Sequence, residues 1–260
     1  MYVIKRRGLF NCEAVEPFKV SRYQIEQYLE CPCCFWKNHR KGIRRPSSPP
    51  FTINMLVDSV LKKEFDGHRA AQTTHPIMAA HGLDAVPFQH PMIEEWRQNF
   101  KGMVYIDARN NLKVYGSVDD IWQDRKSKKL TVVDYKATAK NGEVTLDADW
   151  QLSYKRQMEV YIWLLRNQGF EVEDRGFFLY ANGQQAERFD HKITFAVSLL
   201  PYTSSTEWIE PTLDKLKACL MANEAPQASA DCEFCGYISA NLVFNNGHDP
   251  ALPKRARKAA

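Results

Sequence analysis

The chain has 260 residues, of which 44% are hydrophobic, and this is enough apolar material to bury a substantial core and to exclude a disordered protein. No uncharged apolar run reaches membrane-spanning length, and the first seventeen residues lack the apolar stretch of a signal peptide, so we expect a soluble globular protein of the cytoplasm. The net charge of +4 permits a polyanionic partner without requiring one.

The N-terminal part of the chain predicts a short strand and then helices. Ser21 is followed three residues later by Gln24, a capping box that begins a short helix, and Pro32 helps to end it. A turn-rich segment precedes a second, amphipathic helix that contains Asp58. Its apolar residues recur at helical spacing: Ile53, Leu56, Val57, Val60, Leu61 and Phe65. Residues 68–91 are loop-like, and residues 91–100 predict a further helix.

The second half of the chain mixes strands and helices. Three β-rich runs with short polar spacers predict an antiparallel three-stranded meander: residues 102–107, 112–124 and 128–138. A long amphipathic helix then runs over residues 148–169 and is stopped by its final glycine. Two more strands and a helix that Pro211 either starts late or kinks complete the pattern. This order of elements predicts a mixed α/β protein.

The apolar run "LTVVDYKAT" stops at Asp134, Tyr135 and Lys136. Residues i and i+2 of a strand share a face, so the carboxylate and the ammonium point the same way, and burying such a pair without purpose is costly. In the preceding run, a hairpin would bring either Asp119 or Asp120 alongside Asp134. Two converging carboxylates suit Mg²⁺ or Mn²⁺, and an ammonium can orient or deprotonate an attacking water, as phosphodiester hydrolysis requires. The alternative is a surface ion pair near a strand end.

The seven cysteines are informative by their spacing. An odd number without a secretory signal argues against a disulfide framework. Cys31 and Cys34 form one C-x-x-C pair, and Cys232 and Cys235 form a second, which together give the ligands of a four-thiolate site for Zn²⁺ or an iron–sulfur cluster. Cys33 is an alternative to Cys31 or Cys34. Unligated thiols or an occasional disulfide are the other interpretation.

These motifs, taken in order, resemble the RecB-like branch of the PD-(D/E)XK nuclease superfamily. The resemblance is carried by "SRYQIEQYLECPCCFW", "GSVDD", "VVDYK", "QMEVY" and "CEFC", from Ser21 to Cys235. It implies an α/β (α+β) fold with a restriction-endonuclease-like core, in which helices flank a central mixed sheet. The fold is expected to be a single domain over 1–260, with the cysteine groups at 31–34 and 232–235 joining its N- and C-terminal segments. The basic tail over 253–260 is expected to be disordered.

The resemblance also implies roles for residues of the strand motifs. It assigns Asp119 as the metal-binding acid of the glycine-x-x-aspartate motif and Asp134 as the second ligand for Mg²⁺ or Mn²⁺. It assigns Lys136 as the catalytic lysine and the backbone carbonyl of Tyr135 as a further metal ligand.

Three further expectations follow from the same resemblance. Gln157 and Tyr161 lie i and i+4 on one helix face and would position the active site and the nucleic-acid strand. Where relatives often carry a metal-binding histidine, Asp58 stands here, as an oxygen ligand or as a solvated residue. Relatives commonly hold [4Fe-4S] on one N-terminal and three C-terminal cysteines, whereas the split here is two and two, which keeps Zn²⁺ as the alternative.

The sequence therefore predicts a metal-dependent deoxyribonuclease acting on single-stranded or end-containing DNA. One alternative is a nucleic-acid-binding or scaffold protein that kept the fold and a structural zinc site but lost catalysis. Another is a zinc-stapled protein in which the "DYK" triplet is accidental. DNA repair, CRISPR adaptation and mobile elements all use this fold, so the pathway stays open, as does the question of whether a helicase or other nucleic-acid-processing protein supplies the substrate.

Overall fold

The computed structural model describes residues 8–47 and 49–245, and these form two compact units. The first unit holds residues 8–13, 27–47 and 215–245, and the second holds residues 14–26 and 49–214. The single domain expected over 1–260 stays a prediction. The basic tail over 253–260 lies outside the described residues.

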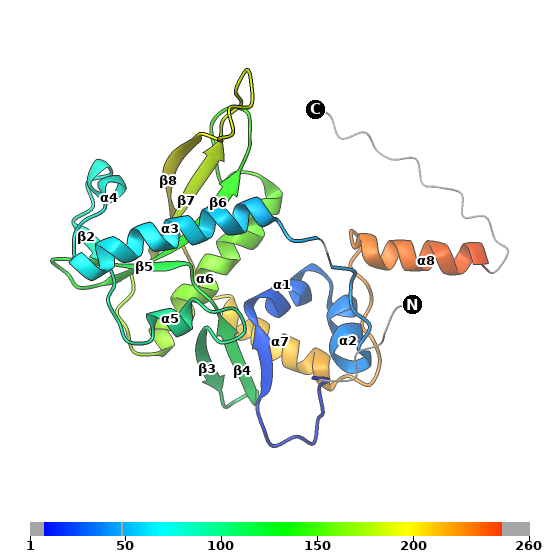
Figure 1. Ribbon diagram of the computed structural model, residues 1–260. Coiled ribbons are helices and arrows are strands. Elements are labelled where there is room, and N and C mark those ends of the chain that lie inside the picture. Colours follow the sequence, from blue (N-terminus) through cyan, green and yellow to red (C-terminus); the bar gives the residue numbers. More distant parts are fainter. Residues whose placement is uncertain (1–7, 48, 246–260) are drawn as a thin grey trace. The chain divides into compact units, whose positions relative to one another are not determined.

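The strands all belong to the second unit and form two sheets (Figure 1). A three-stranded sheet has the order β1-β4-β3, with β1 parallel to β4 and β3 antiparallel to it. Its strands are β1 Phe18–Ser21, β3 Met103–Asp107 and β4 Leu112–Gly116. A five-stranded sheet has the order β2-β5-β6-β7-β8, in which only the β6–β7 pair is parallel. Its strands are β2 Ala85–Pro87, β5 Asp120–Asp124, β6 Leu130–Thr138, β7 Arg175–Gly183 and β8 Phe195–Thr203.

The helices occur in both units, and the boundary between the units falls within α1 and α7. None of the described helices is long and apolar enough to cross a membrane. Their bounds are α1 Arg22–Glu30, α2 Pro32–Lys41, α3 Thr52–Ala71, α4 Pro76–Ala80, α5 Ile93–Trp96, α6 Leu152–Asn167, α7 Ile209–Met221 and α8 Glu233–Asn245, with a 3₁₀ turn η1 at Asp149–Gln151. Helices that pack on mixed sheets confirm the predicted α/β class.

The core of the five-stranded sheet lies on the face that α3 covers. Phe65 of α3 is fully buried and stacks on Trp122 of β5, with ring centroids 5.5 Å apart. Burying one such side chain contributes roughly 1.5–3 kcal/mol. Val133 and Tyr135 of β6 point into the same core. Because side chains alternate along a strand, Asp134 faces the opposite side, where α6 packs.

Local sequence signals placed the helix starts well. The backbone N–H of Gln24 donates to Ser21 Oγ at 3.2 Å, and the N–H of Ser21 donates to Gln24 Oε1 at 2.6 Å, so the predicted capping box forms. Pro32 stands at the start of α2, immediately after α1. Pro211 lies in the first turn of α7, where a missing N–H is tolerated.

The expected three-stranded meander is wrong. The run over 112–124 forms two strands, and β4 and β5 belong to different sheets because residues 117–119 interrupt the pairing. The stretch 68–91, expected to be a loop, contains α4 and β2. The helix α3 forms as predicted, but its first turns are not covered, since Ile53 and Leu56 are 53% and 59% exposed.

Candidate active site and cysteine metal centre

The candidate active site lies where β5 stops pairing with β6. The pair Asp120–Val133 is at the end of the β5–β6 ladder, whereas β6 continues to Thr138 alongside β7. Asp119 takes the place of the missing strand partner, because the backbone N–H of Tyr135 donates to Asp119 Oδ2 at 2.9 Å. The N–H and C=O of one strand residue point to the same side, so the Tyr135 carbonyl faces this opening as well. The strand that ends at the site is thus β5, and β6 runs on past the Asp134–Lys136 pair.

The two adjacent aspartates have different environments. Asp120 is fully buried, forms an ion pair with Arg69, and accepts hydrogen bonds of 2.8 Å from the Tyr135 hydroxyl and from the Ile121 N–H. These partners leave Asp120 no free position for a ligand, and it acts as a structural group. Asp119 alone therefore lies beside the carboxylate of β6. The burial of Arg69 in this network was not anticipated, and its position one helical turn beyond Phe65 was the available signal.

Asp134 is a fully buried carboxyl group with one unsatisfied oxygen. The Gln157 side-chain amide donates to Oδ1 at 3.0 Å. The Lys136 ammonium forms an ion pair with Oδ2, but this oxygen accepts no hydrogen bond of good geometry from the residues that the structure describes. Burial raises the pKa of Asp134 to about 7, against the pull of Lys136, and the nearby Asp119 raises it further. Two neighbouring carboxyl groups and a carbonyl fit the oxygen donors that Mg²⁺ or Mn²⁺ prefers.

Three side chains of α6 line the same opening. The Gln157 amide that donates to Asp134 also donates to the Tyr161 hydroxyl at 2.9 Å. The Lys136 ammonium lies over the Tyr154 ring, 4.5 Å from its centroid. Tyr154, Gln157 and Tyr161 follow one another at i, i+3 and i+7, which is the spacing of a single helix face. That spacing is the signal that would have added Tyr154 to the predicted site.

The glycine of the "GSVDD" motif makes room for Tyr161. A Cβ atom added at Gly116 would lie 2.7 Å from Tyr161 Cε1 and 3.1 Å from Cδ1. Tyr161 is only 3% exposed, and burial raises the pKa of its hydroxyl. The "GSVDD" and "QMEVY" motifs are therefore linked by a direct packing contact between Gly116 and Tyr161.

Asp58 is connected to the site by the side chain of a lysine, Lys62, with which both Asp58 and Asp119 form ion pairs. Lys62 Nζ lies 2.9 Å from Asp58 Oδ2 and 3.3 Å from Asp119 Oδ1, so one ammonium bridges the two acids. Burial, and then the charge of Asp119, raises the pKa of Asp58. Among the described residues, only the cysteines bring three or more ligand atoms within 4.8 Å of one another, so Asp58 does not join the other carboxylates. Lys62 was missed from the sequence, although it follows Asp58 at i+4.

The four predicted cysteines form one group in the first unit. The Sγ atoms of Cys31, Cys34, Cys232 and Cys235 all lie within 4.8 Å of one another, and Cys33 is not in the group. The separations are 3.9 Å for Cys31–Cys235 and 3.5 Å for both Cys34–Cys232 and Cys34–Cys235. Four sulfurs at ~2.3 Å from one tetrahedral ion are ~3.8 Å apart, so these distances fit a single ion. The cluster joins N- and C-terminal segments, as expected.

The electrostatics of these thiols also fit a cation. Cys31 is the N-cap of α2, and although burial opposes its ionisation, nearby backbone N–H groups, that of Cys34 foremost, lower the pKa of Cys31 to about 6. Burial and the neighbouring thiols raise the pKa of Cys235. Metal binding requires cysteine thiolates, so a thiol with a lowered pKa, such as Cys31, and a cation that stabilises the others fit a metal centre.

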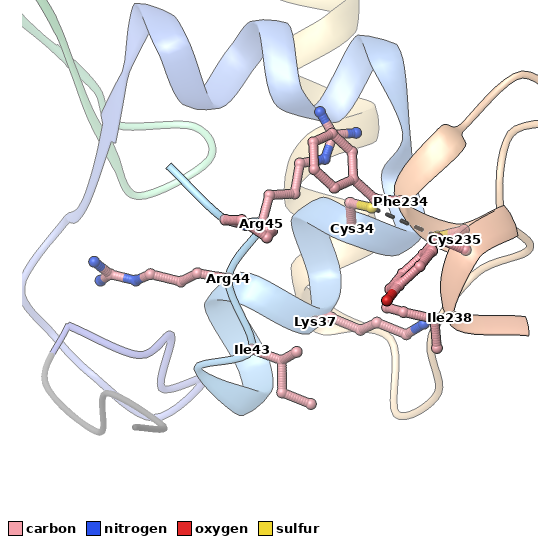
Figure 2. Close-up of a pocket in the computed structure, with 10 residues that line it drawn as sticks. Cys34, Lys37, Ile43, Arg44, Arg45, Phe234, Cys235 and Ile238 are labelled. Carbon is pink, nitrogen blue, oxygen red and sulfur yellow. Dashed lines mark hydrogen bonds between the residues drawn. The ribbon is translucent and has the colours of Figure 1, made fainter. Parts of the chain in front are cut away.

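A cavity of about 290 Å³ opens beside this centre (Figure 2). Cys34 and Cys235 line it, together with Lys37 of α2 and Ile238 of α8. Arg45 lies against the Phe234 ring, 4.8 Å from its centroid, and forms an ion pair with Glu30. Two of the four cysteines of the centre therefore lie in the wall of a cavity that opens to solvent.

Comparison with protein families places these features in a known class. The model of the PD-(D/E)XK nuclease superfamily matches residues 52–240, which is well over half of the chain. The chain belongs to the PD-(D/E)XK nuclease superfamily. The match includes every predicted residue of the carboxylate site and the second cysteine pair, whereas Cys31 and Cys34 precede it.

Two solved structures are similar over most of the chain. One is the crystal structure of SSO0001, at 14% identity over 87% of this chain and 87% of that chain, with a TM-score of 0.39. The other is a protein from Eubacterium rectale that carries a provisional assignment as an exonuclease, at 14% identity over 92% of this chain and 89% of that chain, with a TM-score of 0.40. No curated protein matches the sequence.

Proposed function

We propose that this protein is a metal-dependent deoxyribonuclease that hydrolyses phosphodiester bonds of single-stranded or end-containing DNA. The observation that carries the proposal is the meeting of Asp119 and Asp134 beside Lys136, at the point where β5 leaves β6 without a partner. Burying these charges lowers the stability of the fold, so a structural role alone accounts for them poorly.

The proposed site assigns a part to each group. Asp119, Asp134 and the Tyr135 carbonyl would hold Mg²⁺ or Mn²⁺, with Asp58 reached by displacing the Lys62 ammonium. A bound divalent ion supplies a lowered pKa for water and charge neutralisation on the phosphate. Hydrolysis adds the water oxygen to phosphorus and breaks one ester P–O bond.

The side chains around the carboxylates would orient the reactants. Lys136, held between Asp134 and the Tyr154 ring, orients the attacking water and neutralises the charge that develops on the phosphate oxygens. Gln157 fixes the Asp134 carboxyl through one amide hydrogen and the Tyr161 hydroxyl through the other, so it acts as a positioning residue.

The cysteine centre would have a structural part in this protein. The Sγ separations favour Zn²⁺ over [4Fe-4S], because a cluster placed between the sulfurs holds them farther apart than one ion does. Seven free thiols suit a reducing cytoplasm. Iron and zinc analysis of anaerobically purified protein, with its visible spectrum, distinguishes the two metals.

A second candidate function is a nucleic-acid-binding module without catalysis. It is favoured by one observation, namely that Lys62 and Lys136 already neutralise the carboxylates by ion pairs. Cleavage of labelled single- and double-stranded DNA with Mn²⁺ or Mg²⁺ separates the candidates. The nuclease proposal expects cleavage by the wild type and by the control Lys113→Ala, and none by Lys136→Ala. Binding without cleavage by all three proteins would favour the binding module.

A further inference from the structure

A second cavity adjoins the candidate active site within the same unit. It has a volume of about 330 Å³, and its wall includes Arg22, Tyr23, Phe100 and Tyr161. This volume lies at the lower end of ligand pockets, roughly 300–1,000 Å³, which suits a ligand of the size of one nucleotide. Tyr161 belongs to both places, because its hydroxyl accepts from the Gln157 amide that also donates to Asp134. Only two side chains thus separate the cavity from the proposed catalytic carboxylates.

Phe100 stands at this cavity in an unfavourable conformation. The residue is 81% exposed, and its φ of 75° lies in the left-handed region, which bulky residues rarely adopt. The Lys19 ammonium holds it there by donating to the Phe100 carbonyl at 2.7 Å, and the same ammonium lies 4.2 Å from the centroid of the Tyr115 ring. Strain of this kind persists only where the surrounding structure compensates for it, and here the held conformation leaves the Phe100 side chain exposed to solvent. Tyr23, 59% exposed, supplies a second ring.

The charge of the cavity favours an anion. Arg22 forms no salt bridge with any residue in the part of the chain that the structure describes, although it lowers the pKa of the Tyr161 hydroxyl against the effect of burial. Arg22 is also the first residue of α1, and the N-terminal N–H groups of a helix attract negative charge. A cation beside exposed aromatic rings is the combination that binds single-stranded nucleic acid, whose phosphates need charge and whose bases need stacking.

We propose that this cavity binds one unpaired nucleotide of the DNA strand next to the scissile phosphate, with the base stacked on Phe100 and Tyr23 and a phosphate at Arg22. The proposal rests on the nuclease function proposed above and specifies its substrate. A base within a duplex is stacked on both sides and cannot place its face on Phe100, so the cavity selects a single strand or a frayed end.

The test compares cleavage kinetics of matched variants on a single-stranded oligonucleotide with Mn²⁺. Phe100→Ala should raise KM about 5- to 150-fold, the range that loss of one base stack produces, with kcat within about twofold of the wild type. The control Phe189→Ala removes an equally exposed ring, 76% exposed, elsewhere in the same unit and should leave both constants unchanged. Phe100→Gly should give the same KM increase while raising the melting temperature, because glycine suits the left-handed φ.

Substrate changes identify the nucleotide that is bound. A set of oligonucleotides, each with one abasic position, should contain one position at which loss of the base raises KM for the wild type and has no further effect in Phe100→Ala. Wild-type cleavage with a flat abasic series and an unaltered Phe100→Ala would overturn the inference while leaving the nuclease proposal in place. If the wild type cleaves nothing, the nuclease proposal fails. Fluorescence anisotropy of a labelled oligonucleotide in EDTA then tests whether the cavity binds single-stranded DNA. Equal affinity of wild type, Phe100→Ala and Arg22→Met would refute it.

Discussion

The contact between Gly116 and Tyr161 allows a change to be predicted with a magnitude. In Gly116→Ala the new Cβ would stand 2.7 Å from Tyr161 Cε1, about 1 Å inside an ordinary carbon–carbon contact of ~3.5–4.0 Å. The backbone of Gly116 belongs to strand β4 and accepts an alanine, so the ring of Tyr161 must move. Overpacking of this size costs about 1–3 kcal/mol of unfolding free energy. A displacement of ~1 Å at a positioning residue lowers kcat roughly 100-fold.

The assay combines steady-state cleavage of single-stranded DNA with thermal unfolding followed by circular dichroism. A matched control is Gly67→Ala, because a Cβ at Gly67 in α3 meets nothing within 4 Å. That control should gain roughly 0.5–1 kcal/mol of stability and keep wild-type kcat. A Gly116→Ala protein with wild-type kcat and melting temperature would refute the packing argument, since the ring would then not constrain the site.

Three further outcomes are expected. Burial raises the pKa of Asp134 from 3.8 to about 7, so the contribution of this group to stability in EDTA falls as the pH rises from about 4 to 7. Asp134→Asn should therefore be more stable than the wild type by roughly 1–3 kcal/mol at pH 8 but not at pH 4, as urea unfolding would measure. Lys62→Met removes an ammonium that competes with the metal for Asp119, so the Mn²⁺ dissociation constant measured by calorimetry should fall roughly tenfold. The control Lys63→Met changes an exposed neighbouring lysine and should bind Mn²⁺ as the wild type does. Cys31→Ser should lose the bound metal, as elemental analysis would show, and at least ~3 kcal/mol of unfolding free energy. The control Cys12→Ser changes an exposed cysteine and should keep the metal and the stability. Retention of metal by Cys31→Ser would exclude the four-thiolate site.

Signals within one element were read correctly from the sequence. The capping box of Ser21 and Gln24 depends on atoms three residues apart, and the face of α6 with Gln157 and Tyr161 depends on helical spacing. The alternation along β6 placed Asp134 and Lys136 on one face because a strand leaves no other choice. Short-range geometry fixes such features before the rest of the chain is placed.

Features that depend on two distant segments were missed. The separation of β4 and β5 into different sheets depends on which distant strands each one pairs with, β1 and β3 for β4 and β2 and β6 for β5, and periodicity does not record such pairing. The bridging position of Lys62 depends on how α3 packs beside Asp119, and the exposure of Ile53 and Leu56 depends on which neighbours cover the first turns of α3, so neither follows from the sequence of α3 alone. The grouping of the cysteines was predicted although the two pairs are far apart in the sequence, because two C-x-x-C pairs together supply the four ligands of a metal site.

The central claim is that Asp119 and its neighbours form a metal-dependent nuclease site. It is tested most directly by measuring Mn²⁺ binding, by electron paramagnetic resonance, and cleavage of labelled DNA in the same samples of wild type and Asp119→Asn. Circular dichroism should first show that both proteins are folded. Asparagine keeps the size of the side chain, and its oxygen can still accept from the Tyr135 N–H. We expect Mn²⁺ binding and cleavage to be lost together in the variant. Equal Mn²⁺ binding and equal cleavage by the two proteins would contradict the account.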